Sequence, residues 1–135
     1  MKRWLPGILI ILVISVLVAC GNNSEKQHSD HKSSDKPQAL KADLKVPSEA
    51  KKGETSELSV AVTLGDEKVK DASEVKFEIV KNGDKDHSEM KTAKNNKNGE
   101  YTLKYDFKDA GKYNITSHVT ARDQHTMPNK NVNVK

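Results

Sequence analysis

Apolar and polar residues alternate one by one along several stretches of this 135-residue chain. The alternation is strictest over residues 58–64 and 101–107, where every second residue is apolar. Because successive side chains of a β-strand point to opposite faces, this pattern predicts strands that bury one face. No stretch shows a convincing helical period, so the chain is expected to fold from strands alone.

Turn residues separate these stretches at short intervals. Asn82-Gly83 is the strongest hairpin signal among them. The expected strands cover residues 40–46, 58–64, 75–79, 87–92, 101–107, 113–121 and 132–134, the segment 87–92 being the weakest. About seven short strands in some 95 residues predict an all-β fold, an immunoglobulin-like β-sandwich.

One local motif supports that architecture. The segment 109–113 resembles the start of strand F in immunoglobulin-like domains, where a tyrosine hydrogen-bonds to the backbone just upstream. Tyr113 is therefore expected to be a structural anchor. The cysteine pair and the strand-C tryptophan of antibody domains are missing, so the likeness is one of architecture.

The first twenty residues have the features of an export signal. Lys2 and Arg3 precede an apolar run over residues 8–18, and Leu17-Val18-Ala19-Cys20 resembles a lipobox. We expect cleavage before Cys20, lipidation of Cys20 by fatty acyl chains such as palmitate, and a lipoprotein held on the extracytoplasmic side of the cell membrane. The alternative is an uncleaved membrane anchor, for which the apolar run is short.

Residues 21–38 contain no large apolar side chain and are expected to form a flexible tether. His28 and His31 lie in it and could collect metal loosely. The folded domain is then expected to cover residues 39–135. The net charge of +4 comes from interleaved signs, which does not favour nucleic-acid binding. Cys20 is the single cysteine, so a soft-metal site in the domain would need histidine and methionine.

Two histidines and a methionine lie within ten residues of one another near the C terminus. Residues 113, 115 and 119 are apolar and odd-numbered, so His118 is expected to face outward. Val132 and Val134 are even, which turns His125 and Met127 outward as well. A two-residue turn at 122–123 or at 123–124 keeps all three on one face, whereas a three-residue loop does not.

Imidazole suits copper, and a thioether selects Cu(I) over harder ions. Zinc is less favoured, because no thiolate or nearby carboxylate is visible in the cluster. A tight hairpin at Asn82-Gly83 would place His87 opposite residue 78, on the outer face, and Met90 opposite residue 75, on the inner face. His87 is thus the preferred further ligand, with Met90 second.

Several segments of the chain are similar to the YtkA-like family of small exported β-sandwich domains, which is related to the FixH type. The resemblance extends from about Glu74 to the C terminus and rests on residues 99–101, 110–113 and 118–122, followed by His125 and Met127-Pro128. It implies a copper-linked role outside the membrane, such as a chaperone that carries copper to respiratory oxidase assembly, with His118, His125 and Met127 as ligands.

These observations predict a membrane-anchored copper-binding lipoprotein that hands Cu(I) to a copper-accepting membrane protein. The alternative is a metal-free immunoglobulin-like interaction module that docks on a membrane complex or the cell wall. An enzyme is not expected, because there is no nucleophile elbow, zinc-protease motif or phosphate loop, and no acidic pair with a Glu or Asp beside the histidines.

Overall fold

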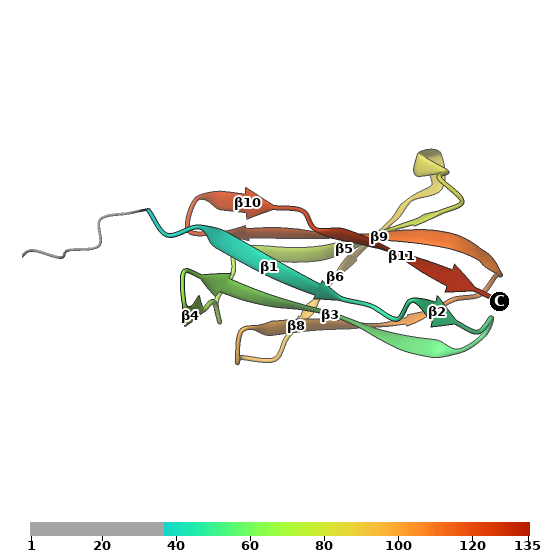
Figure 1. The fold of residues 1–135 in the computed structure, drawn as a ribbon, viewed down its shortest axis with the longest axis horizontal. Helices are drawn as coiled ribbons and strands as arrows, with labels where there is room; N and C mark the ends of the chain where they lie inside the picture. Colours follow the sequence, from blue (N-terminus) through green and yellow to red (C-terminus); the bar gives the residue numbers. More distant parts are fainter. Residues whose placement is uncertain (1–36) are drawn as a thin grey trace, which may run out of the picture. The chain divides into compact units, whose positions relative to one another are not determined.

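The computed structural model describes residues 37–135, and these residues form two packed β-sheets (Figure 1). The first sheet has the strand order β1-β3-β8-β7, and β4 pairs with β3 beside this path. Its strands are β1 (Leu40–Lys45), β3 (Thr55–Leu64), β4 (Glu67–Lys68), β7 (Lys94–Asn95) and β8 (Glu100–Asp106). The long antiparallel pair β3–β8 comes from the two stretches in which the alternation is strictest, and β1 pairs with the other edge of β3.

The second sheet has the strand order β2-β11-β9-β5-β6, and β10 pairs with β9. Its strands are β2 (Glu49–Ala50), β5 (Glu74–Lys81), β6 (Glu89–Thr92), β9 (Gly111–Ala121), β10 (Gln124–Thr126) and β11 (Asn129–Val134). The expected all-β sandwich is confirmed. The short strands β2, β4 and β7 were not expected, because two-residue pairings leave no alternation in a sequence.

The inner faces of the two sheets make one core. Phe77 and Ile115 from the second sheet, Leu58 from the first and Phe107 just after β8 are fully buried. On β9 the odd-numbered residues 113–121 are buried and the even-numbered ones are partly exposed, as the alternation predicts. Ser117 differs from the other buried residues of β9 because it is polar, and its buried hydroxyl has no hydrogen-bond partner among the described residues.

Tyr113 holds the start of β9 in place. Its hydroxyl donates to the backbone carbonyl of Asp109 at 3.0 Å, and its ring packs edge-on against Phe107 with centroids 4.9 Å apart. The predicted tyrosine corner is therefore confirmed.

The connection from β5 to β6 differs from the tight hairpin that was predicted. Asn82 and Gly83 do turn the chain with positive φ, but the 3-10 helix η1 (Lys85–His87) follows before β6 begins. The Asp84 side chain accepts a hydrogen bond from the backbone N–H of Asp86 and so caps η1. Glu78 consequently pairs with Met90, and the predicted pairing of residue 78 with His87 is wrong.

Three predictions from the sequence concern residues outside the described range. They are the export signal at 1–20 with Cys20, most of the tether at 21–38, and the possible role of His28 and His31. Within residues 37–135, η1 is a single short turn, and no helix has the length and apolar character needed to cross a membrane.

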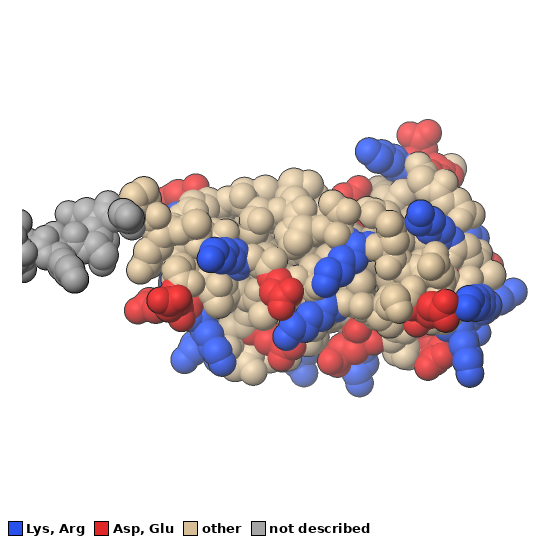
Figure 2. All heavy atoms as spheres, in the orientation of Figure 1, with Lys and Arg blue, Asp and Glu red and all other residues tan. Residues whose placement is uncertain are grey.

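On the face that Figure 2 shows, basic and acidic side chains are interleaved.

Candidate metal centre

A two-residue turn joins β9 to β10 and sets the register of the candidate ligands. Arg122 and Asp123 have φ values of 50° and 59°, the left-handed conformation that a type I′ turn requires at both positions. His125 consequently pairs with Thr120. This is the first of the two predicted registers, in which residue 127 lies opposite residue 118.

Pro128 interrupts the last strand without changing that register. The pairings Thr126–Val119 on β10 and Asn129–Thr116 on β11 belong to the same alignment with β9. Between them, the Ser117 N–H donates to the Pro128 carbonyl at 2.9 Å, but proline has no N–H to return the bond. Met127 therefore lies opposite His118 on β9, in a pair whose side chains come close together.

The hairpin is fastened to the opposite sheet on one side. The Gln124 side chain accepts from the Leu40 N–H and donates to the Gln38 carbonyl, both at 2.9 Å. Gln124 immediately precedes His125, and Gln38 is among the first described residues of the chain. Gln38 therefore lies beside the hairpin that carries the candidate ligands.

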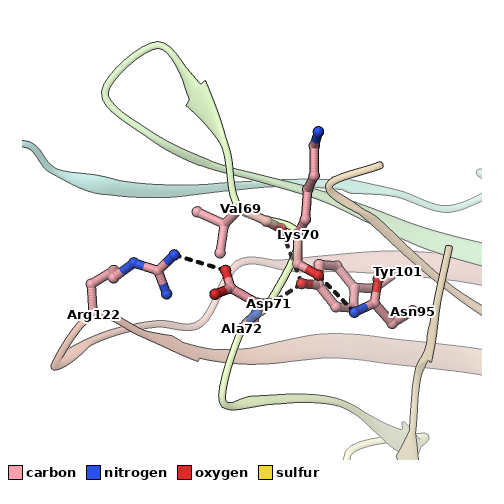
Figure 3. A network of polar contacts seen from close by, with 7 residues as sticks. All are labelled: Val69, Lys70, Asp71, Ala72, Asn95, Tyr101 and Arg122. Carbon is pink, nitrogen blue, oxygen red and sulfur yellow. Dashed lines mark hydrogen bonds and ion pairs between the residues drawn. The ribbon is translucent and has the colours of Figure 1, made fainter. Parts of the chain in front are cut away.

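A polar network holds the turn on its other side (Figure 3). Arg122 donates to the Asp71 carboxylate at 2.7 Å, and this contact lowers the pKa of Asp71 and raises that of Arg122. The loop that carries Asp71 is itself fixed, because the Tyr101 hydroxyl donates to the Val69 carbonyl and accepts from the Ala72 N–H. The contact between Arg122 and Asp71 therefore ties the turn to a loop that the first sheet supports.

The two histidines lie close together on the outer face of the second sheet. The ring centroids of His118 and His125 are 6.0 Å apart. His118 is partly buried, and its Nε2 lies 2.9 Å from Oε2 of Glu78. His125 is exposed, and its Nδ1 lies 2.8 Å from the Thr120 hydroxyl. Each ring thus has one nitrogen in a hydrogen bond with a protein oxygen and keeps the other for a further contact.

Glu78 corrects an expectation from the sequence. The cluster was expected to have no nearby carboxylate, yet Glu78 contacts His118 directly across 40 residues of sequence. The signal available was weak: residue 78 lies between the apolar residues Phe77 and Ile79, so its outward direction could be predicted. Its position beside His118 follows only from the register of β5 against β9.

Glu74 and Lys76 are further charged neighbours on β5. Lys76 pairs with His118 across the strands and makes an ion pair with Glu74 at 2.7 Å. The pKa of the Glu74 carboxyl is lowered, chiefly by this hydrogen bond with Lys76 and less by the charges of His118 and His125. The Glu74 carboxylate is thus engaged in an ion pair with Lys76, whereas the Glu78 carboxylate contacts His118.

The structure places the two further candidate ligands, His87 and Met90, differently from the prediction. His87 lies in η1, is largely exposed, and has its Nδ1 2.8 Å from the Asp84 carboxylate. The structure does not bring it to His118. Met90 lies opposite Glu78 on β6 and is half exposed, because the three-residue shift in register turns it from the expected inner face to the outer one.

Within residues 37–135, no group of three or more histidine, cysteine, aspartate or glutamate side chains is arranged to hold a metal ion. The candidate centre therefore depends on the thioether of Met127, which is 48 % exposed. Residues 124–129 carry no charged side chain apart from a histidine that can gain a proton. Two neutral imidazoles and one thioether form a soft donor set, which fits Cu(I) better than a hard ion.

Comparison with known families identifies the family of the chain. The sequence model of the YtkA-like family matches residues 34–118. The chain belongs to the YtkA-like family. The match begins well before Glu74, where the resemblance was expected to start, and it ends at His118. His125 and Met127 thus lie beyond the part of this YtkA-like chain that the family model covers.

Solved structures share the fold of the YtkA-like domain at low sequence identity. An endo-β-1,4-mannanase from Thermotoga petrophila aligns with 76 % of this chain and 21 % of its own, at 12 % identity and a TM-score of 0.56. A single-substitution variant of the superoxide reductase (neelaredoxin) from Ignicoccus hospitalis aligns over 76 % and 85 %, at 12 % identity and a TM-score of 0.50. These likenesses concern the fold alone, and the chain spans about a fifth of the mannanase. Comparison with curated proteins finds no match.

Proposed function

We propose that this YtkA-like protein is a lipid-anchored extracytoplasmic carrier that binds Cu(I) through His118, His125 and Met127. It would pass the ion to a copper-accepting membrane protein, such as a respiratory oxidase under assembly. Its role would be binding and transfer, with no reaction catalysed.

The observation that carries this proposal is the spacing of the two imidazole rings. A first-row metal ion lies about 2.0–2.1 Å from an imidazole nitrogen, so two rings that share one ion have centroids roughly 5–6.5 Å apart. The rings of His118 and His125 are 6.0 Å apart. Met127 lies opposite His118 in the strand register, which puts a sulfur donor on the same face of the sheet.

The exposure of the centre favours transfer over storage. His125 and Met127 are both exposed, so an incoming ligand from a partner could replace them one at a time. Thioether and imidazole also remain usable in an oxidising compartment, where exposed thiols pair into disulfides. These properties support a carrier that releases its ion to another protein.

The place where the chain enters the domain supports a membrane partner. Gln38 contacts Gln124 in the candidate hairpin, and Cys20 lies only eighteen residues before Gln38 in the sequence. If Cys20 carries the lipid, its tether joins the domain at the end that bears the metal ligands.

The test is a Cu(I) competition titration of the full-length chain in detergent against a chromogenic chelator, beside the Met127→Ala variant. We expect one Cu(I) per chain, bound tightly in the wild type and more weakly in the variant. Failure of the wild type to compete would contradict the proposal. The exposed Met90 and Met127, which share one sheet face, would then favour the metal-free interaction module.

A further inference from the structure

We propose that Glu78 is a positioning residue of the metal centre: it fixes the His118 ring so that Nδ1 is the nitrogen presented to the ion. This inference rests on the proposed function and adds a residue that is not a ligand. It identifies which nitrogen of His118 binds and what holds the ring in that orientation.

The first support is the environment of the contact. The distance between His118 Nε2 and Glu78 Oε2 is 2.9 Å, and the side chains are 17 % and 25 % exposed. Among the ion pairs of the described chain, this one is the least exposed. Because solvent competes less for partly buried groups, a hydrogen bond here orients its partners more firmly than one at the open surface.

The second support is the donor chemistry of the pair. An ionised carboxylate only accepts hydrogen bonds, so Nε2 of His118 must carry the hydrogen. When the ring is neutral, its lone pair is then on Nδ1. Metal-binding histidines commonly donate their other N–H to a carboxylate in this way, which fixes both the tautomer and the ring orientation.

The third support is the rigidity of the strand that carries Glu78. β5 is paired on both sides, with β9 and with β6, and Glu78 lies opposite Thr116 and Met90 in these two ladders. The neighbouring side chains of Phe77 and Ile79 are buried in the core. The carboxylate therefore projects from a backbone that cannot easily move away from His118.

Glu74 provides a natural control on the same strand and face. It carries the same charge and lies opposite Thr120, the residue that contacts His125. Its ion pair is with Lys76, and that pair is more exposed. Removing the charge of Glu74 changes the local electrostatics in a similar way but leaves the hydrogen bond to His118 intact.

The experiment compares Glu78→Gln, Glu78→Ala and Glu74→Gln in the full-length chain, with Cu(I) alone as the probe. The amide oxygen that Glu78→Gln introduces can still accept from Nε2, so this variant should keep its affinity within about threefold. Glu78→Ala should lose on the order of 10- to 100-fold, as removal of such outer partners does. Glu74→Gln should match the wild type, and all three variants should melt near the wild-type temperature.

A second readout needs no metal. In the metal-free protein at alkaline pH, the nitrogen NMR shifts of His118 should report the Nε2–H tautomer in the wild type and Glu78→Gln, and a mixture in Glu78→Ala.

Two results would overturn the inference. Wild-type affinity and tautomer in Glu78→Ala would show that the carboxylate does not position the ring. Equal loss in Glu78→Gln and Glu78→Ala would make Glu78 a ligand or a charge effect instead. If the wild type binds no copper, the proposed function fails by itself, and the tautomer measurement still decides whether Glu78 orients His118.

Discussion

The two ends of β9 are built in different ways. Near its start, Tyr113 points into the core and bonds to the backbone of Asp109, only four residues upstream. Near its end, His118 points outward and meets Glu78, which lies 40 residues away in sequence. One strand thus carries a local structural anchor and an outward-facing candidate site, and the alternation of side chains keeps the two apart.

The contacts that hold the end bearing the site are long-range. Gln124 reaches back across 86 residues to Gln38, and Arg122 reaches across 51 residues to Asp71 (Figure 3). Tyr113 should therefore contribute to stability and not to binding, whereas His118 should decide what the domain binds.

The largest effect is expected from His118→Ala compared with His87→Ala. Loss of a ligand should weaken Cu(I) binding by more than the roughly 100-fold that loss of an outer partner costs. His87 lies in η1 beside Asp84, away from the centre, so its removal should leave the affinity unchanged. Chelator competition on both variants measures this difference, and equal losses would mean that η1 takes part in the site.

Tyr113→Phe should act on stability alone. The variant leaves the Asp109 carbonyl without its donor, so the free energy of unfolding should fall by about 0.5–1.5 kcal/mol. Cu(I) affinity of the folded protein should not change. Denaturant unfolding and chelator competition on the same sample test both halves, and a loss of affinity without a loss of stability would reverse the assigned roles.

Ser117→Ala should stabilise the domain by about 1 kcal/mol, because it removes a buried hydroxyl that has no partner among residues 37–135. Ser117 lies next to His118 but faces the core, so copper binding should remain as in the wild type. Thermal melting provides the measurement. A lower melting temperature would show that the hydroxyl contributes a favourable contact.

Asp123→Gly should give the smallest gain. Asp123 has a φ of 59°, and glycine adopts this conformation without the steric cost of a Cβ, so the hairpin should gain about 0.5 kcal/mol. The contact of Arg122 with Asp71 is kept. Urea unfolding tests the gain, while a change in copper affinity would mean that the turn alters the position of His125.

The sequence predicted features that depend on neighbouring residues. Alternation identified the long strands and their faces, and the segment 109–113 identified the tyrosine corner. The turn at Arg122-Asp123 was one of two possibilities, because neither residue is a glycine or asparagine that would mark a type I′ turn.

The features it missed depend on pairing between distant strands. The 3-10 helix η1, which Asp84 caps, shifts the pairing of β6 with β5 by three residues relative to the predicted hairpin. This shift turns the Met90 side chain to the outer face and keeps His87 away from His118. The contact of Glu78 with His118 needs the register of β5 against β9, and no local pattern records it. The candidate site could thus be located from sequence, but the groups around it could not.

The most direct test of the account is X-ray absorption spectroscopy of the Cu(I)-loaded full-length chain, beside Met127→Ala and Met90→Ala. The account predicts nitrogen and sulfur donors in the wild type, with the sulfur lost in Met127→Ala and retained in Met90→Ala. A wild-type spectrum without sulfur, or sulfur that persists in Met127→Ala, would contradict a centre built from His118, His125 and Met127.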